Sequence, residues 1–270
     1  MRFKIAVAVL LSSGLSACSS DKEDTYVAQD VEALYNYAST MMERGNYKFS
    51  AVYFDEVERQ HPYSPWARRA MLMSAYSYYR SSDYEEAILS AERFLTLHPG
   101  NTSAPYAHYL IANSYYAQIS DVGRDQKATQ QALTALHEVV VRYPNSDYAR
   151  DAQLKIEMTR DHLAGKELDV GRFYQDHGQY LAAIGRFRKV VENYQTTSQT
   201  PEALHRLVET YLSIGLKDEA QQVAAVLGYN YPESKWYGYS YTLLTGQDLT
   251  PQMPKEGGEG WMSRLFGSIF

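Results

Sequence analysis

The sequence lacks most of what an enzyme or a disulfide-held fold requires. Only one of its 270 residues is a cysteine, so no disulfide can form within the chain. It contains no H-E-x-x-H, G-x-S-x-G, Walker or paired C-x-x-C motif, and no two of its seven histidines are spaced i, i+3 or i, i+4. We therefore predict that the protein is not an enzyme and has no catalytic residue, no metal site and no cofactor.

Positive charge is also scarce. The 26 lysines and arginines are outnumbered by 32 acidic residues, which gives a net charge of −6. Nucleic-acid binding depends on a basic surface that neutralises phosphates. This balance argues against a nucleic-acid partner.

Long hydrophobic runs are missing as well, and the apolar stretch Ile5 to Leu11 falls short of the roughly 20 residues needed to span a membrane. Because Arg2 and Lys4 precede it and small residues follow it, residues 1–17 read as a signal peptide.

The end of this segment, Leu15-Ser16-Ala17-Cys18, resembles the lipobox of bacterial lipoproteins. The resemblance implies that Cys18 becomes the first mature residue and carries an S-diacylglycerol and an N-palmitoyl group, which together give stable anchoring. Ser19 rather than an acidic residue follows, which in that family implies the periplasmic face of the outer membrane. The alternative is a chance cysteine after an ordinary signal peptide.

What the sequence does contain is a repeated pattern. In its first copy a turn at Gly45 is followed by Tyr47, a small residue at Ser50, Phe54 and a closing Pro62. Glycine permits the tight turn, the small residue lets two helices approach, and proline ends the second helix. The same register recurs at Tyr84, Ala87, Ala91, Phe94 and Pro99; at Ala132, Leu136, Val139 and Pro144; at Gly178, Tyr180, Ala183, Phe187 and Val190; and at Gly215, Ala220, Ala224, Leu227 and Pro232.

These copies predict an all-α fold, a right-handed α-solenoid of five tetratricopeptide-like hairpins, with a generic helical bundle as the alternative.

The absence of proline from Asp147 to Asp176 predicts one long helix linking repeats 3 and 4, which Gly165 or Gly171 could kink. A polar stretch from Gln118 to Lys127 predicts a loop inside the third hairpin. The expected segments are a tether over 18–29, a solenoid over 30–245 (repeats at about 30–62, 65–99, 103–144, 147–195 and 200–232, plus a capping segment), a flexible linker over 246–260 and an apolar segment over 261–270.

Tyrosine is abundant, with 25 copies, and most of them occupy repeat positions. One such position is held by Tyr143, Tyr194 and Tyr231 and also by His61 and His98, which are therefore packing residues rather than metal ligands. First helices carry a further group, of which Tyr78 and Tyr115 fall at consensus packing positions. Tyr79 and Tyr116 do not, and they either line a groove for an extended peptide or fill the core.

Five strings give the chain a family resemblance. They are His61-Pro62-Tyr63-Ser64-Pro65-Trp66-Ala67, Ala75-Tyr76-Ser77-Tyr78-Tyr79, Arg93-Phe94-Leu95-Thr96-Leu97-His98-Pro99, Tyr143-Pro144-Asn145-Ser146-Asp147-Tyr148-Ala149 and Val170-Gly171-Arg172-Phe173-Tyr174. With them, residues 18–235 resemble the BamD family of outer-membrane lipoproteins.

The resemblance implies a scaffold of the β-barrel assembly complex. Its C-terminal repeats would bind the periplasmic POTRA region of BamA, and its N-terminal repeats would bind unfolded outer-membrane β-barrel proteins. Other Bam lipoproteins are further expected partners. Arg186 matches a basic position linked in the family to coupling between BamA and substrate; the alternative is a solvated arginine beside Arg188. The runner-up function is a tetratricopeptide lipoprotein for pilus assembly or envelope division.

The chain departs from the family pattern near its end. Trp261, Leu265 and Ile269 lie four residues apart, and Met262, Phe266 and Phe270 lie beside them, which predicts a short helix with one apolar face. Trp261 and Phe266 are expected to dock into a partner groove or to rest on the membrane. A frayed end without a role is the alternative.

Overall fold

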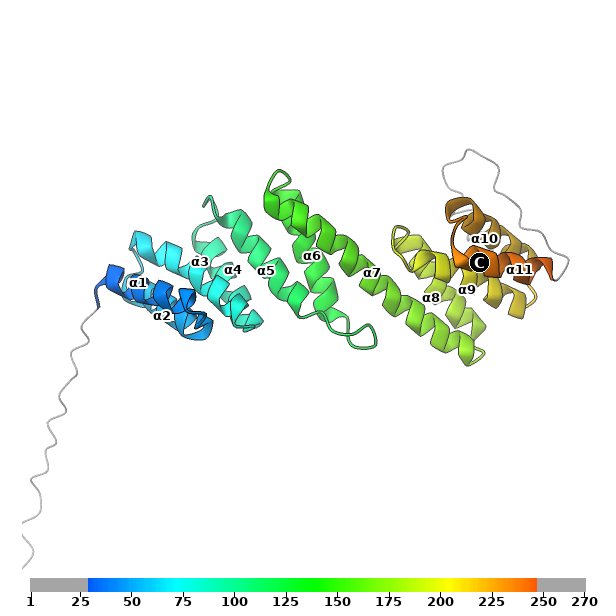
Figure 1. The fold of residues 1–270 in the computed structure, drawn as a ribbon, viewed down its shortest axis with the longest axis horizontal. Helices are drawn as coiled ribbons and strands as arrows, with labels where there is room; N and C mark the ends of the chain where they lie inside the picture. The colour runs from blue at the N-terminus through cyan, green and yellow to red at the C-terminus, as the bar shows by residue number, and fades with distance from the viewer. Residues whose placement is uncertain (1–28, 247–270) are drawn as a thin grey trace, which may run out of the picture.

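The protein is a row of helical hairpins. The computed structural model describes residues 29–246, which contain eleven α-helices and, within that range, no β-strand (Figure 1). The helices are α1 (Val31–Glu43), α2 (Tyr47–Gln60), α3 (Pro65–Arg80), α4 (Tyr84–Leu97), α5 (Ala104–Ala117), α6 (Lys127–Arg142), α7 (Asp147–Asp176), α8 (Tyr180–Asn193), α9 (Thr200–Ser213), α10 (Lys217–Asn230) and α11 (Lys235–Thr245). The predicted all-α solenoid of tetratricopeptide-like hairpins is confirmed.

The tight turns within the hairpins use left-handed backbone. The φ angles are +79° at Gly45, +70° at Gly178 and +83° at Gly215, whereas Ser82 takes the same place in the second hairpin at +66°. Glycine reaches this region without a clash, and any other residue is strained there. The second helices α2, α4 and α8 then begin at the repeated tyrosines Tyr47, Tyr84 and Tyr180, as the repeat pattern predicted.

The second helices also end alike. Each is followed by one residue whose φ lies between −137° and −130° and whose N–H donates to the carbonyl four residues earlier. These residues are His61, His98, Tyr143, Tyr194 and Tyr231. Their assignment as structural repeat positions is confirmed.

The longest helix, α7, runs for 30 residues without a break, so it extends about 45 Å and links the third hairpin to the fourth. The predicted long helix is confirmed, and neither glycine within it interrupts the helix. Gly171 instead lets α8 approach closely, because a Cβ at this position would lie 2.4 Å from the Phe187 ring. At Gly165, a Cβ would meet Val122 of the α5–α6 loop at 3.7 Å.

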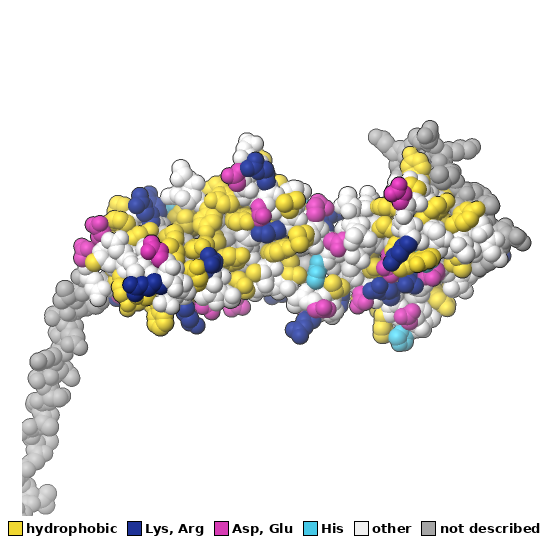
Figure 2. Space-filling view, viewed as in Figure 1, with side chains coloured by type: hydrophobic (Ala, Val, Ile, Leu, Met, Phe, Trp, Pro, Cys, Tyr) yellow, Lys and Arg dark blue, Asp and Glu magenta, His cyan; other side chains and the backbone are white. Residues whose placement is uncertain are grey.

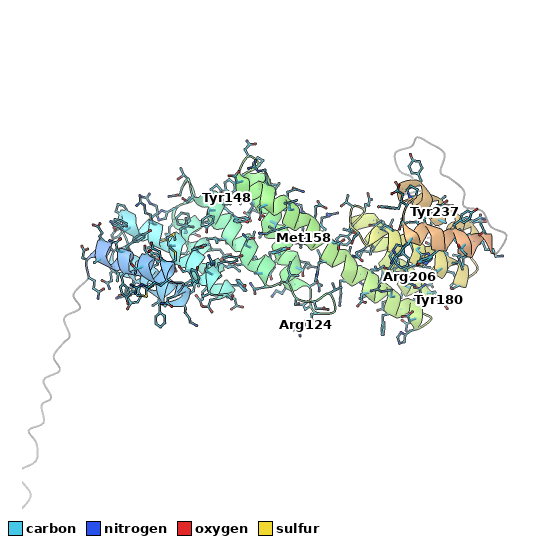
Figure 3. The ribbon with its side chains drawn as sticks, viewed as in Figure 1. Arg124, Tyr148, Met158, Tyr180, Arg206 and Tyr237 are labelled. Atoms are coloured by element: carbon cyan, nitrogen blue, oxygen red, sulfur yellow. The ribbon has the colours of Figure 1, made fainter. Side chains whose placement is uncertain are left out.

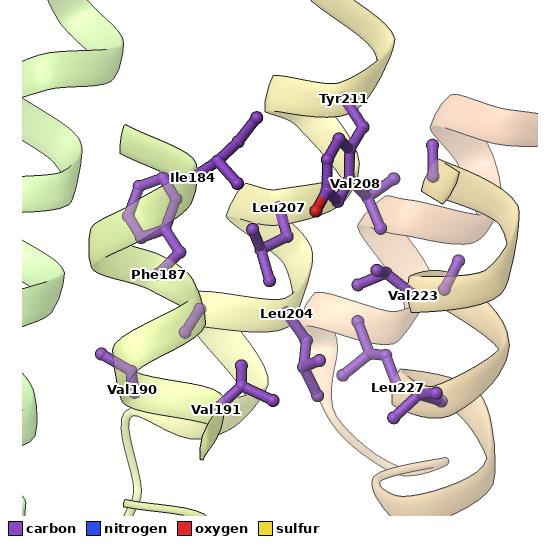
Figure 4. Packing of buried hydrophobic residues seen from close by; sticks show 14 of the residues in the cluster. Ile184, Phe187, Val190, Val191, Leu204, Leu207, Val208, Tyr211, Val223 and Leu227 are labelled. Carbon is purple, nitrogen blue, oxygen red and sulfur yellow. The ribbon is translucent and has the colours of Figure 1, made fainter. Parts of the chain in front are cut away.

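Apolar side chains form four buried clusters. Three smaller ones lie between α1 and the first part of α7 and centre on Phe54, Phe94 and Leu136. One large cluster extends from the second part of α7 to α11 and includes Phe187 and Tyr211 (Figure 4). The array therefore consists of an N-terminal half, from α1 to the middle of α7, and a C-terminal half, from there to α11.

Candidate functional site

The first helices of successive hairpins lie side by side. Contacts join α1 to α3, α3 to α5, α5 to α7 and α7 to α9, so these helices share one face of the array. In the view of Figure 2, hydrophobic side chains gather over α3, α5 and the first part of α7. We call six of the half-buried tyrosines of these three helices the tyrosine strip: Tyr76, Tyr79, Tyr106, Tyr109, Tyr116 and Tyr148.

Ring contacts connect the strip across helices. The Tyr148 ring on α7 lies 5.5 Å from Tyr106 and 5.1 Å from Tyr109, both on α5, with tilted geometry. Such aromatic pairs stabilise beyond the area they bury. Burial also raises the pKa of Tyr106 and of Tyr79, so both phenols keep their protons and remain donors.

Lys155 on α7 contacts two rings of the tyrosine strip. Lys155 Nζ lies 2.7 Å from the Asp151 carboxylate, donates to Asn113 Oδ1 at 2.6 Å, and lies 5.1 Å from the Tyr109 ring and 5.6 Å from the Tyr116 ring. Burial opposes the charge, but the hydrogen bonds to Asp151 and Tyr109 outweigh it and raise the pKa of Lys155. The strip therefore combines aromatic faces with a fixed cation.

The two tyrosines singled out in the sequence, Tyr79 and Tyr116, both lie in this strip. Tyr79 packs beside the Phe94 cluster, and the Tyr116 hydroxyl lies 3.6 Å from Met158 Sδ on α7. Met158, labelled on α7 in Figure 3, is 60% exposed. By contrast, Tyr78 donates to Asp55 Oδ2 at 2.7 Å and ties α3 to α2.

Arg186 lies in a polar cleft between the two halves. This cleft has a volume of about 490 Å³ and is bordered by the α5–α6 loop, α7 and α8; Lys166, Arg124 and Lys189 also line it. Arg186 Nη1 donates to Glu167 Oε2 at 2.8 Å, and Lys189 pairs with the other oxygen of that carboxylate. Arg186 is thus fixed to α7, whereas Arg188 pairs with Glu192 on its own helix.

The charges of this cleft are interdependent. Burial raises the pKa of Glu167, but the hydrogen bonds from Lys189 and Arg186 exceed that effect and hold its pKa below the usual range. Lys166 Nζ in turn donates to the Gly123 carbonyl at 3.0 Å. The predicted loop of the third hairpin is confirmed, and it is docked on α7.

At the other end of the array, α11 closes the C-terminal half. His205 on α9 is only 5% exposed, and its Nδ1 lies 2.8 Å from Ser240 Oγ on α11. Its Nε2 lies 3.4 Å from Glu209, and its ring lies 5.2 Å from Trp236. These groups have the residue types of a catalytic triad, but Ser240 is fully buried.

Sequence reasoning missed both polar groups. Lys155 meets partners on α5 that lie 42 and 46 residues away, and His205 meets Ser240 across 35 residues. Only the i, i+4 spacings of Asp151 with Lys155 and of His205 with Glu209 offered a local signal. Three predicted residues, Cys18, Trp261 and Phe266, lie outside the described residues.

The part of the chain that the structure describes has neither a membrane-spanning helix nor a group of metal-binding side chains. Between residues 29 and 246 no helix is both long and apolar enough to cross a membrane. In the same range no three His, Cys, Asp or Glu side chains gather closely enough to hold a metal ion. The class of protein defined by this geometry is a tetratricopeptide-like solenoid with an aromatic face.

Known proteins identify the family. A family model described as an outer membrane lipoprotein, YfiO, matches residues 27–227. The outer membrane protein assembly factor BamD of Caulobacter vibrioides is 54% identical over 247 residues, which cover 90% of this chain and 81% of that protein. The BamD protein of Rickettsia prowazekii is 43% identical, over 90% of this chain and 98% of that protein. The BamD protein of Neisseria meningitidis serogroup A is 33% identical, over 88% of this chain and 95% of that protein. The chain belongs to the BamD family of outer-membrane lipoproteins.

This membership bears on the functions inferred from sequence. It confirms the family resemblance, and it does not favour pilus assembly or envelope division. The relatives are named as assembly factors of outer-membrane proteins.

Proposed function

We propose that this chain is a lipid-anchored, non-catalytic scaffold of the β-barrel assembly complex and acts in the insertion of proteins into the outer membrane. Its relatives are named as outer membrane protein assembly factors. The lipobox resemblance at Cys18 supports an anchor on the periplasmic face of that membrane. The observation that carries the proposal is the tyrosine strip, a continuous aromatic face on three neighbouring helices.

The strip suits an unfolded outer-membrane protein as its ligand. A strand that has not yet paired is an extended segment with alternating apolar and polar side chains, and it needs apolar faces and hydrogen-bond partners at regular intervals. The rings of Tyr79, Tyr106 and Tyr116 supply the faces, and their phenolic hydroxyls are donors. Exposed Met158 adds an adaptable apolar contact at the edge.

The C-terminal half suits a folded partner, for which we propose the POTRA region of BamA. Its apolar side chains form one large cluster, so it presents a rigid surface. On α11, Tyr239 and Tyr241 are 54% and 48% exposed. Arg186 lines the cleft between the two halves and would couple the two ligands. Other Bam lipoproteins are proposed as further partners, and Trp261 and Phe266 as an additional contact to a partner or to the membrane.

Complementation after depletion tests the proposal. Tyr79→Ala/Tyr116→Ala is expected to lower the amount of folded outer-membrane β-barrel protein several-fold relative to wild type. The matched control is Leu89→Ala/Leu181→Ala, which truncates two side chains that are 59% and 79% exposed on the second helices α4 and α8. Normal barrel levels with the tyrosine variant present at wild-type abundance would refute the role of the strip.

The anchor has a separate test. Cys18→Ser is expected to abolish acylation, so the variant should lack the mass of the three acyl chains that mass spectrometry is expected to find at Cys18 of the wild-type protein. An unmodified Cys18 thiol in membrane-extracted protein would contradict the anchor.

A further inference from the structure

The N-terminal end of the solenoid carries a group of side chains that the proposed scaffold role does not use. In the turn between α2 and α3, Tyr63 is 100% exposed, between Pro62 and Pro65. Immediately after it, the first turns of α3 carry Trp66, Arg68 and Arg69. We call Tyr63, Trp66, Arg68 and Arg69 the N-terminal tip.

The tip is rigid. Ser64 caps α3 by accepting a hydrogen bond from the Trp66 N–H at 3.1 Å, and the Trp66 ring packs on Tyr35 of α1 at 4.7 Å. The Arg69 guanidinium lies over the Trp66 ring, 5.6 Å from its centroid. Because these contacts fix the turn, Tyr63 is held outward and does not fold back on the protein.

The arginines of the tip differ from most others in the described chain. Arg68 and Arg69 are both exposed, and no carboxylate of residues 29–246 lies within 4 Å of either guanidinium to form an ion pair. They line a cavity of about 440 Å³ whose other walls include Leu72 and Met73. Two unpaired guanidiniums beside an apolar wall are complementary to a phosphate that carries an acyl chain.

The chain enters the solenoid next to this tip. The Gln29 N–H donates to Gln60 Oε1 at 2.8 Å, and the Gln29 carbonyl lies 2.7 Å from His61 Nε2. Both partners are at the end of α2, two or three residues before Tyr63. The point at which the tether ends is therefore fixed to the α2–α3 turn.

The length of the tether restricts what can face the tip. Gln29 is the eleventh residue after Cys18, so the connecting chain spans at most about 40 Å, and about 20 Å on average for a flexible chain. An anchor at Cys18 thus keeps the tip within this distance of the lipid surface. The cap formed by α11 lies at the opposite end of the array (Figure 1).

From these observations we infer that the N-terminal tip is a membrane-contact surface: Tyr63 enters the headgroup region, the half-buried Trp66 ring lies beside it, and Arg68 and Arg69 bind phospholipid phosphates. Tyrosine and tryptophan favour this interface because their rings are amphipathic. The contact makes the anchor a two-point attachment, which orients the solenoid relative to the bilayer. The inference rests on the proposed lipid anchor.

Photo-crosslinking tests it independently of acylation in the cell. The mature chain, residues 18–270, is coupled through its single thiol at Cys18 to a maleimide lipid in vesicles of phosphatidylethanolamine and phosphatidylglycerol. Tyr63 is replaced by p-benzoylphenylalanine, and in the matched control the same replacement is made at Tyr239, which is 54% exposed on α11. Lipid adducts are expected to be at least ten-fold more abundant at position 63. Equal yields at the two positions would overturn the inference.

A charge reversal gives a second, milder test. Arg68→Glu/Arg69→Glu is expected to reduce the lipid adducts at position 63 at least three-fold, whereas Lys127→Glu/Lys217→Glu, with the same change in net charge at exposed positions elsewhere, leaves them unchanged. Circular dichroism checks that both variants keep their helical content. Unchanged adducts with the arginine variant, or protein adducts in place of lipid adducts in intact cells, would contradict the contact. A thiol at Cys18 that is unmodified in cells would defeat the proposed anchor alone.

Discussion

The two halves of the solenoid bury their side chains in different ways. The N-terminal half has three small clusters and places tyrosines on its surface, where Tyr109 and Tyr148 pair with each other and with polar neighbours. The C-terminal half has one large cluster from α7 to α11, and Tyr211 lies inside it at 1% exposure. A repeat array gains stability from each interface between neighbours. The N-terminal half is therefore suited to local adjustment around an extended ligand, and the C-terminal half to rigid docking.

The largest effect is expected from Phe187→Ala in the C-terminal cluster. Phe187 is fully buried and its ring contacts α7 at Gly171, so truncation leaves a cavity and should lower the free energy of unfolding by about 3–5 kcal/mol. Hydrogen exchange is expected to accelerate from α7 to α10 together. The matched variant Phe94→Ala, at the same repeat position, should accelerate exchange only from α3 to α5. If hydrogen exchange accelerated over equally many helices in both variants, the proposed difference in burial between the two halves would be wrong.

Acid should weaken the C-terminal half through Glu209. Burial alone would raise the pKa of this carboxyl, but the hydrogen bond from His205 and the charges of His205 and Arg206 lower it to about 2, from an ordinary 4.5. Because the folded-state pKa is depressed, the stabilisation is present above pH 4.5 and is lost as the pH falls towards 2.

This carboxyl is partly exposed to solvent, so we expect a loss of about 1–2 kcal/mol over that range. The free energy of unfolding in urea, measured at several pH values with probes in α9 and α11, gives the size of this loss. Glu209→Gln should remove this part of the pH dependence. An unchanged slope in that variant would show that other carboxyls are responsible.

A pair of tyrosine variants sharpens the contrast between the halves. The Tyr211 hydroxyl is buried without a hydrogen-bond partner in the described structure, so Tyr211→Phe should raise the free energy of unfolding by about 1 kcal/mol. Tyr109→Phe removes the hydrogen bonds to Asp151 and Lys155, so it should lower that free energy by about 1 kcal/mol. Chemical denaturation measures both. Shifts of the same sign would contradict the different roles assigned to the two hydroxyls.

The smallest effect is expected from a turn glycine in the N-terminal half. In Gly45→Ala the new methyl group meets no atom within 4 Å, so the cost arises only from the positive φ and should be about 0.5–1 kcal/mol. Gly100→Ala is the matched control, since its Cβ is equally unhindered and its φ is not in the left-handed region. Thermal unfolding should separate the two variants, and identical midpoints would argue against backbone strain.

The sequence predicted the features that depend on local spacing. Turns at Gly45 and Gly215, helix ends at His61 and Tyr231, and the uninterrupted α7 all follow from residues a few positions apart. The partners of the strip could not be read in this way, because Tyr109 and Lys155 meet only after α5 and α7 have packed. The role of Gly171 was also hidden, because helix propensity gives no information on the ring that covers it.

Because α7 is unbroken, it also fixes the angle by which one half is rotated relative to the other about the helix axis. Each residue of a helix advances the chain by about 100° and 1.5 Å. Deleting one residue near Lys166 would therefore turn the C-terminal half by about 100° relative to the tyrosine strip while shortening the molecule by less than the width of an atom. A partner that contacts both halves at once must fit the rotation of one half relative to the other. The length of α7 therefore restricts the orientation of such a partner more strictly than the distance between its two contacts.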